Sequence, residues 1–363
     1  MKKLRLYIYT ALTFIMLSSC VNTTEEQEIL DFSPLGSSQA QEAFYATELL
    51  GNNPWLDYTG HIEVLPIFAN PIQWNMEQSR FKTPFTSDAE LAEIITDAAL
   101  AMGWTAPIKE IEFEEFGVGH IIVNGWIDES TRIELWSTRL ALRFIFEEGL
   151  PLGNGIYDSN REEAEETIQY LITRFSNILD MENPTSSITQ HYNFAGDKQI
   201  VHSVFDAGSG DIVDAILGYN FSTINFMASL DEYGQSKGTL WIIDVNLPRL
   251  HLSQPLGEYP IITSDEARAL LLEGFYISTI TEMHWPGEKY ALVELVYRVG
   301  MHYDTIMPYY LFRIEIPEYI SGRQMGEAWP TRPEELKTFG YWWVPAIQRE
   351  YLPYPQLRPV MFN

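Results

Sequence analysis

The chain contains almost no cysteine. Cys20 is the only cysteine among 363 residues. A single thiol excludes an intramolecular disulfide, a zinc site built from several thiolates and a Cys-x-x-Cys redox centre. A domain of about 340 residues can bury enough apolar surface to be stable without such cross-links. The fold must therefore be held by its core, and the one thiol is available for another purpose.

Basic residues are also scarce. The chain has 23 lysines and arginines against 50 aspartates and glutamates, a net charge of −27 at pH 7. Such a surface repels nucleic-acid phosphates and anionic lipid headgroups, so we expect no nucleic acid partner. It attracts cations and basic peptides, although solubility outside the cell is the simpler interpretation of this composition.

The signatures of common catalytic classes are missing from the sequence. The stretch nearest to a Gly-x-Ser-x-Gly elbow, residues 207–211, has the wrong glycine spacing and predicts a turn. There is no His-Glu-x-x-His motif and no phosphate-binding glycine loop. Among seven histidines, only His191 and His202 suggest a cross-strand pair, and that pair lacks a third metal ligand. We therefore expect no catalytic residue, no metal site and no cofactor.

The N-terminus has the pattern of an export signal. Three basic residues lie within the first five positions, and an apolar stretch of about a dozen residues follows, too short to span a bilayer. Leu17-Ser18-Ser19-Cys20 then resembles the lipobox of bacterial lipoproteins. This resemblance implies a diacylglycerol on the Cys20 thiol and cleavage just before it. We expect a signal peptide at 1–19 and a lipid-anchored domain on the extracytoplasmic side of the cell membrane.

The lipid is expected to be the sole membrane anchor. Loss of the signal removes three basic residues and no acidic one, so the net charge becomes −30. Residues 20–40 are polar and acidic and predict a flexible tether. No later segment approaches 18 uninterrupted apolar residues.

Three capping boxes predict three helices. They are Ser87-Asp88-Ala89-Glu90, Ser159-Asn160-Arg161-Glu162 and Thr263-Ser264-Asp265-Glu266. Apolar residues at helical spacing follow each box, and Gly103 and Gly274 are placed to end the first and third helices.

Segments rich in β-branched and aromatic residues follow each expected helix. The expected strands are 121–127, 132–146, 188–195, 199–205, 239–247, 290–299, 309–316 and 341–347. Glu112, Glu114 and Glu115 alternate around Phe113 as on an exposed strand edge, and Glu294 and Arg298 predict a partly wet face. We expect an α+β fold of antiparallel sheets with packed helices, in loosely repeated helix-plus-meander units at 41–155, 156–254 and 255–363.

The C-terminal part of the chain carries a family resemblance. Residues 262–267 (Ile-Thr-Ser-Asp-Glu-Ala), 293–298 (Val-Glu-Leu-Val-Tyr-Arg), 308–313 (Pro-Tyr-Tyr-Leu-Phe-Arg) and 341–346 (Tyr-Trp-Trp-Val-Pro-Ala) together resemble PepSY-like extracytoplasmic proteins. That family includes the YycH and YycI regulators of a sensor kinase. The resemblance implies a helix on a small antiparallel sheet and a role in binding or regulation. YycH and YycI have a transmembrane helix where this chain has a lipobox, so the kinase-regulating role is not carried over.

Aromatic residues are the remaining prominent feature, with ten tryptophans and twenty tyrosines. Trp285, Trp329, Trp342 and Trp343 are the candidates for stacking on a ligand; the alternative is that these rings fill a sheet core. In a strand, Trp342 and Trp343 must point to opposite faces. The sequence favours a non-catalytic lipoprotein that binds a peptide, a glycan or an envelope protein. The alternative is an envelope glycan hydrolase using paired carboxylates, which 50 acidic residues neither identify nor exclude.

Overall fold

The fold is mixed and mostly β, with antiparallel strands and a few helices. The computed structural model describes residues 44–46, 62–75, 77–116, 119–151, 169, 172–173, 178–179, 181–192, 198–230, 236–247, 252, 254–278, 292–298, 305–316 and 337–352. The expected signal peptide, Cys20 and the tether lie outside these residues. Among the described residues, no helix is both long and apolar enough to span a membrane.

The first of the described helices precedes a four-stranded meander. Helix α2 (Asp88–Ala101) is followed by β5 (Glu110–Phe116), β6 (His120–Trp126), β7 (Thr131–Trp136) and β8 (Ala141–Pro151). The sequence predicted one strand over 132–146, but a turn at 137–140 divides it into β7 and β8. Leu140 adopts a positive φ of 50° in that turn. Because apolar residues flank the turn on both sides, composition alone does not reveal it.

Local capping explains where α2 begins and ends. The Ser87 side chain accepts from the Glu90 N–H at 3.2 Å, as the expected capping box requires. The Glu90 carboxylate accepts from the N–H of Thr86 at 2.7 Å, one residue before the position the box predicts. Gly103, at φ 84°, follows the C-cap Met102 and allows the chain to leave the helix.

A second meander has a helix inserted in its middle. It consists of β9 (Pro184–Tyr192), β10 (Lys198–Asp206), α4 (Ile212–Phe221), β11 (Thr223–Leu230) and β12 (Ser236–Asn246). The expected pairing of β9 with β10 is present. Helix α4 was not expected; Asp211 caps it by accepting from the Val213 N–H at 2.8 Å. The box at 159–162 lies outside the described residues.

The third group contains the capping box that is fully formed. Its elements are β13 (Gly257–Pro260), α6 (Ser264–Leu272), β14 (Ile277–Ser278), β15 (Leu292–Arg298), β16 (Thr305–Ile316), β17 (Lys337–Pro345) and a 3₁₀ turn, η1 (Arg349–Tyr351). Thr263 and Glu266 each accept from the other's backbone N–H, at 3.2 and 2.7 Å. The prediction of this helix start is confirmed.

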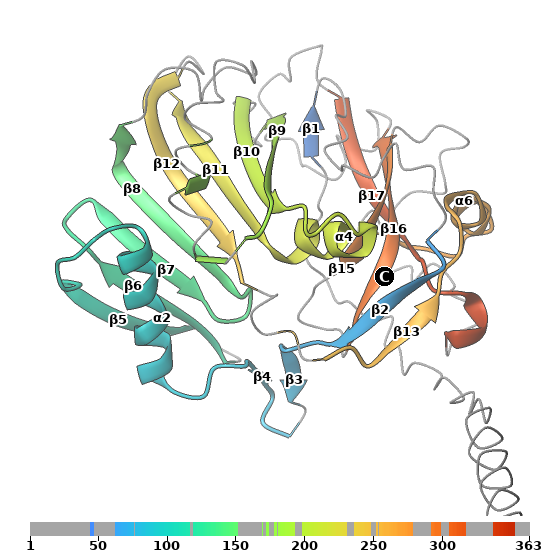
Figure 1. Ribbon diagram of the computed structural model, residues 1–363, viewed down its shortest axis with the longest axis horizontal. Coiled ribbons are helices and arrows are strands. Elements are labelled where there is room, and N and C mark those ends of the chain that lie inside the picture. Colours follow the sequence, from blue (N-terminus) through green and yellow to red (C-terminus); the bar gives the residue numbers. More distant parts are fainter. Residues whose placement is uncertain are drawn as a thin grey trace, which may run out of the picture.

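Strands from the whole chain join one fifteen-stranded antiparallel sheet (Figure 1). Its order is β13-β2-β16-β17-β1-β9-β10-β11-β12-β8-β7-β6-β5, with β14 beside β17 and β15 beside β16. The N-terminal strands β1 (Phe44–Ala46) and β2 (Val64–Ala69) pair with β17 and β16. A separate hairpin is formed by β3 (Gln73–Asn75) and β4 (Arg80–Lys82). β1 and β2 therefore extend the sheet of the C-terminal group.

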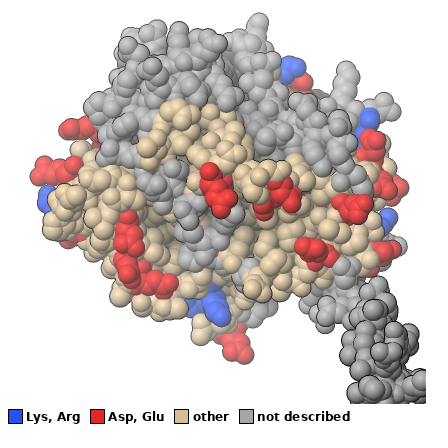
Figure 2. Space-filling view, viewed as in Figure 1, with Lys and Arg blue, Asp and Glu red and all other residues tan. Residues whose placement is uncertain are grey.

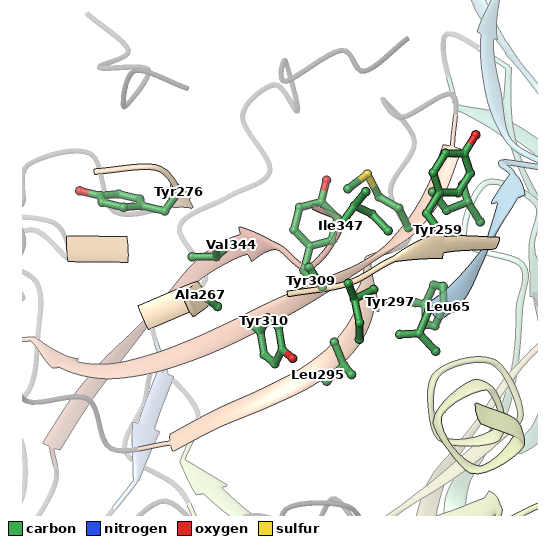
Figure 3. Packing of buried hydrophobic residues seen from close by; sticks show 14 of the residues in the cluster. Leu65, Tyr259, Ala267, Tyr276, Leu295, Tyr297, Tyr309, Tyr310, Val344 and Ile347 are labelled. Atoms are coloured by element: carbon green, nitrogen blue, oxygen red, sulfur yellow. The ribbon is translucent and has the colours of Figure 1, made fainter. Parts of the chain in front are cut away.

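Two hydrophobic cores lie along this sheet. In one, Leu91 and Ile95 of α2 pack with Val123 and Phe144 of β6 and β8. The other combines α6 with β2, β13 and β15–β17, and Figure 3 shows residues of this core such as Leu65, Tyr297 and Val344. Alternation along each strand directs one set of side chains into a core and the other set to the opposite face.

Candidate functional site

A row of polar side chains crosses seven strands on the face of the sheet opposite α2. The row contains, in sheet order from β5 to β10, Glu112, Asn124, Glu134, Arg143, Asp244, Asn225 and Ser203. Each is the direct register partner of the next, so all seven side chains share one face. We call these seven residues the polar row. At the usual strand spacing it is about 29 Å long.

Side chains of the polar row are linked by hydrogen bonds and ion pairs. Arg143 donates to both carboxylate oxygens of Asp244, at 2.7 and 3.3 Å. Glu134 accepts from Arg132 Nε at 3.0 Å and from Trp136 Nε1 at 2.9 Å. Ser203 donates to Asn225 at 2.7 Å. Such connections hold the side chains in a defined geometry before any ligand arrives.

Two tryptophans flank the polar row on the same face. Trp126 lies 5.2 Å from the Arg132 guanidinium and donates from Nε1 to Glu112 at 3.2 Å. Trp136 lies between Arg139 and Arg143, at 4.6 and 5.3 Å from the ring centroid. Both rings are half-buried, and the cations fix their orientation through cation–π attraction.

His120 extends this face beside Trp136, at 5.6 Å between ring centroids. Its Nδ1 contacts the Thr138 hydroxyl. Burial lowers the pKa of His120, and the nearby Arg139 charge lowers it further. The imidazole is therefore held neutral near pH 7.

An acidic hollow lies at the turn between β6 and β7, next to Trp126. Its volume is about 560 Å³ and its lining residues are Lys109, Ile127, Asp128, Glu129, Ser130, Glu147 and Glu148. Arg132 joins it to the polar row by donating to Glu147 at 2.6 Å. Within the part of the chain that the structure describes, no three His, Cys, Asp or Glu side chains are placed to hold a metal ion.

A second charged cluster occupies the β15–β17 part of the sheet. The sequence predicted that Glu294 lies on a face partly exposed to solvent. Its side chain is instead buried, with 2% of the residue exposed, and forms an ion pair with Arg313 at 2.6 Å. The expectation failed because a cross-strand arginine, which the strand's own pattern does not reveal, neutralises the buried carboxylate. Tyr219 of α4 lies near this pair: burial raises its pKa first, Glu294 adds to the rise and Arg313 opposes it.

The four tryptophans predicted to bind a ligand differ in burial and in their place in the fold. Trp342 has no exposed surface and lies in the core of the C-terminal group, so we leave it out of the proposed surface. Trp343 is half-buried on the opposite face, 4.9 Å from the Arg298 guanidinium. In sheet order β1 and β9 separate its strand from the polar row. Trp285 and Trp329 lie outside the described residues.

Other expectations can be compared with the register. In the β9–β10 hairpin His191 lies opposite Gln199 and His202 opposite Ile188. The two histidines are therefore not cross-strand partners, as the sequence had suggested they could be. Residues 208–210 form a turn before α4, as their composition predicted. Trp126, Trp136 and the polar row were not predicted from the sequence. The alternation Arg132-Ile133-Glu134-Leu135-Trp136 was the available signal, but register across seven strands cannot be read from one strand.

Comparison with known proteins gives no family. No family model matches the chain, and no curated protein matches it in sequence. A crystal structure of an uncharacterized protein from Eubacterium rectale is similar over 79% of this chain and 84% of that chain, with a TM-score of 0.40 and 8% identity. A likeness of this size supports no conclusion about function, so the chain is not assigned to a family.

Proposed function

We propose that this chain is an extracytoplasmic lipoprotein that binds a ligand of the cell envelope without transforming it. The lipid on Cys20 holds it at the membrane, and the polar row with Trp126 and Trp136 forms its ligand surface. The observation that supports this most is the seven-strand register, because it aligns polar and aromatic groups on one face over about 29 Å.

The chemistry of the surface fits an extended polar ligand, and we propose a glycan strand. Indole rings stack on the C–H faces of sugars, while the half-buried amide of Asn225 and hydroxyl of Ser203 suit sugar hydroxyl groups. Arg143 and Asp244 pair with each other and Glu134 pairs with Arg132, so a neutral polar ligand would not need to separate these ions.

The same pairing favours binding over hydrolysis. A glycosidase needs one carboxyl group that gives up a proton and a second that acts as nucleophile or base. Arg132 engages Glu134 at 3.0 Å and Arg143 engages Asp244 at 2.7 Å, so both carboxylates are held in ion pairs rather than directed at a bound sugar. Hydrolysis by paired carboxylates remains the alternative function.

The finer architecture is part of the proposal. We propose three loosely repeated, PepSY-like helix-plus-meander units. Support comes from the order of elements: α2 before β5–β8, helical residues 169, 172–173 and 178–179 before β9–β12, and α6 before β14–β17.

Binding by the polar face is testable with the mature chain carrying Cys20→Ala. Titration with envelope polysaccharide fragments should give a measurable Kd, and Trp126→Ala and Trp136→Ala should each weaken it about tenfold. Lys337→Ala is the matched control, because its 3.0 Å ion pair with Glu315 is exposed and lies on β16 and β17. Equal affinity in the parent protein, the two tryptophan variants and the control would contradict the proposed surface. Release of reducing ends from the polysaccharide would instead support the hydrolase.

The anchor has its own test. The precursor with Cys20→Ala should accumulate as a folded protein without acylation, seen by metabolic labelling with a fatty acid. Continued acylation of that variant would contradict the assignment of Cys20.

A further inference from the structure

We propose that the outer edge of β5 is a docking site for one strand of a partner in which basic and apolar residues alternate. Strand β5 is the terminal strand of the sheet, and no described strand pairs with its second edge. This inference does not rest on the proposed glycan surface, because the partner would pair with the backbone edge of the sheet, although Glu112 belongs to both surfaces.

The form of β5 suits strand addition. Its seven residues pair with β6 without a register shift, and the segment contains neither proline nor glycine. Natural sheets commonly protect an edge by shortening it, bulging it or inserting proline. Of the devices that natural sheets use, β5 has only charged side chains, its four glutamates. The edge offers about 24 Å of regular backbone with outward N–H and C=O groups.

The two faces of β5 define the side chains of the partner. Glu110, Glu112 and Glu114 share one face and are all exposed. On the other face Phe113 is 42% exposed, although its neighbour in register, Val123, is fully buried beneath α2, and Glu115 farther along pairs with Arg80 of β4 at 3.8 Å. An added strand would place basic residues beside the glutamates and apolar residues over Phe113. The required pattern therefore alternates basic with apolar.

Charge also decides against a second copy of this chain. Two β5 strands paired edge to edge would set glutamates against glutamates, and like charges directly opposite each other are destabilising. The whole chain carries −27, and Figure 2 shows acidic side chains outnumbering basic ones on the described part of the face in view. The glutamates thus discourage self-association while attracting a basic strand.

The test uses a labelled seven-residue peptide that alternates lysine and valine, titrated into the mature chain at low ionic strength. We expect saturable binding, protection of β5 amides from hydrogen exchange, and a loss of affinity as salt is added. N-methylation of one alternate set of peptide residues should abolish binding, and methylation of the other set should leave it, because only one set faces the β5 edge. Equal effects of the two sets would overturn strand addition.

Variants of the protein complete the test. Glu110→Gln with Glu114→Gln should weaken peptide binding about tenfold at low salt. The matched control is Glu273→Gln with Glu315→Gln, which makes the same charge change away from β5 and should leave the affinity within about twofold. Equal losses in both pairs would reduce the interaction to general charge attraction and overturn the proposal. The proposal would also be overturned if sedimentation showed that the unmodified chain is a dimer and that Phe113→Asp makes it a monomer.

Discussion

Neighbouring tryptophans on β17 have different surroundings. Trp342 is fully buried and lies in the core with Phe312 and Val344. Trp343 is half-buried on the other face, where Tyr309 meets it edge to face at 6.2 Å between centroids. A strand places successive side chains on opposite faces, so one position in sequence separates a core ring from a surface one.

Truncating these two side chains should have unequal effects. Trp342→Ala leaves a large cavity and should lower the free energy of unfolding by about 3–5 kcal/mol. Trp343→Ala removes a ring that is partly solvated and should lower it by less than about 2 kcal/mol. Urea unfolding followed by circular dichroism would measure both. Equal losses would contradict the different burial of the two rings.

His120 makes stability depend on pH. Its folded-state pKa is lowered, chiefly by burial and then by Arg139, from an unfolded value near 6.5. The unfolded chain therefore binds the proton more readily, and the stability that His120 contributes is complete above about pH 6.5 and is lost as the pH falls below that value. Thermal unfolding from pH 7.5 to 5 should show this decline, and His120→Gln should make it shallower. An unchanged slope in the variant would contradict the assignment.

At the scale of elements, α4 links the two parts of the sheet. It lies between β10 and β15 in Figure 1. Tyr219 meets Phe205 of β10 edge to face at 5.2 Å between centroids, and Phe221 lies 5.3 Å from Tyr297 of β15. Asn220 accepts from the Tyr297 N–H at 2.9 Å. One short helix thus contacts strands that are far apart in sheet order.

The closeness of α4 to β10 depends on Gly218. A Cβ at this position would overlap the carbonyl oxygen of Asp206, which is backbone and cannot turn aside. Gly218→Ala should push α4 from the sheet and lower the free energy of unfolding by about 3 kcal/mol. Chemical denaturation would measure the loss.

Gly125→Ala is the comparison for that variant. An added Cβ there meets the Cγ2 methyl of Ile95 rather than backbone, so the loss should be smaller and partly relieved by Ile95→Ala. A Gly218→Ala protein as stable as the wild type would contradict the contact between α4 and Asp206.

At the scale of the whole molecule, excess negative charge opposes compaction. The chain carries −27, and its ion pairs, including Arg143–Asp244 and Arg132–Glu134, neutralise only some of the carboxylates. Repulsion among the others is spread over the surface. The Debye length falls from about 10 Å at 0.1 M salt to about 3 Å at 1 M, so added salt screens this repulsion.

Stability should therefore rise with ionic strength. Calorimetry of the mature domain should show Tm increasing by several degrees between about 0.02 and 0.5 M NaCl. Potassium chloride at the same ionic strength serves as the control, because simple screening does not depend on which cation is present. A falling Tm would mean that attraction within ion pairs outweighs the repulsion.

Much of the local structure could be predicted from the sequence. The Ser87 and Thr263 caps were expected, as were the strands near β6, β12 and β15–β17, because caps and alternation depend on neighbours in the chain. Helix α4 was not expected, because its N-cap follows a glycine turn and its residues are apolar nearly all round. Such a helix shows no clear amphipathic period.

The sequence by itself determined that the single cysteine follows a lipobox-like segment, that the composition is strongly acidic, and where two helices begin. These properties depend on composition and on contacts within a few residues. Only the tertiary structure decided that Glu112, Asn124, Glu134, Arg143, Asp244, Asn225 and Ser203 form one row and that Glu294 is buried against Arg313. Strand register joins residues up to about 100 positions apart, and a shift of one residue would send every side chain to the other face. That alignment is a property of the assembled sheet.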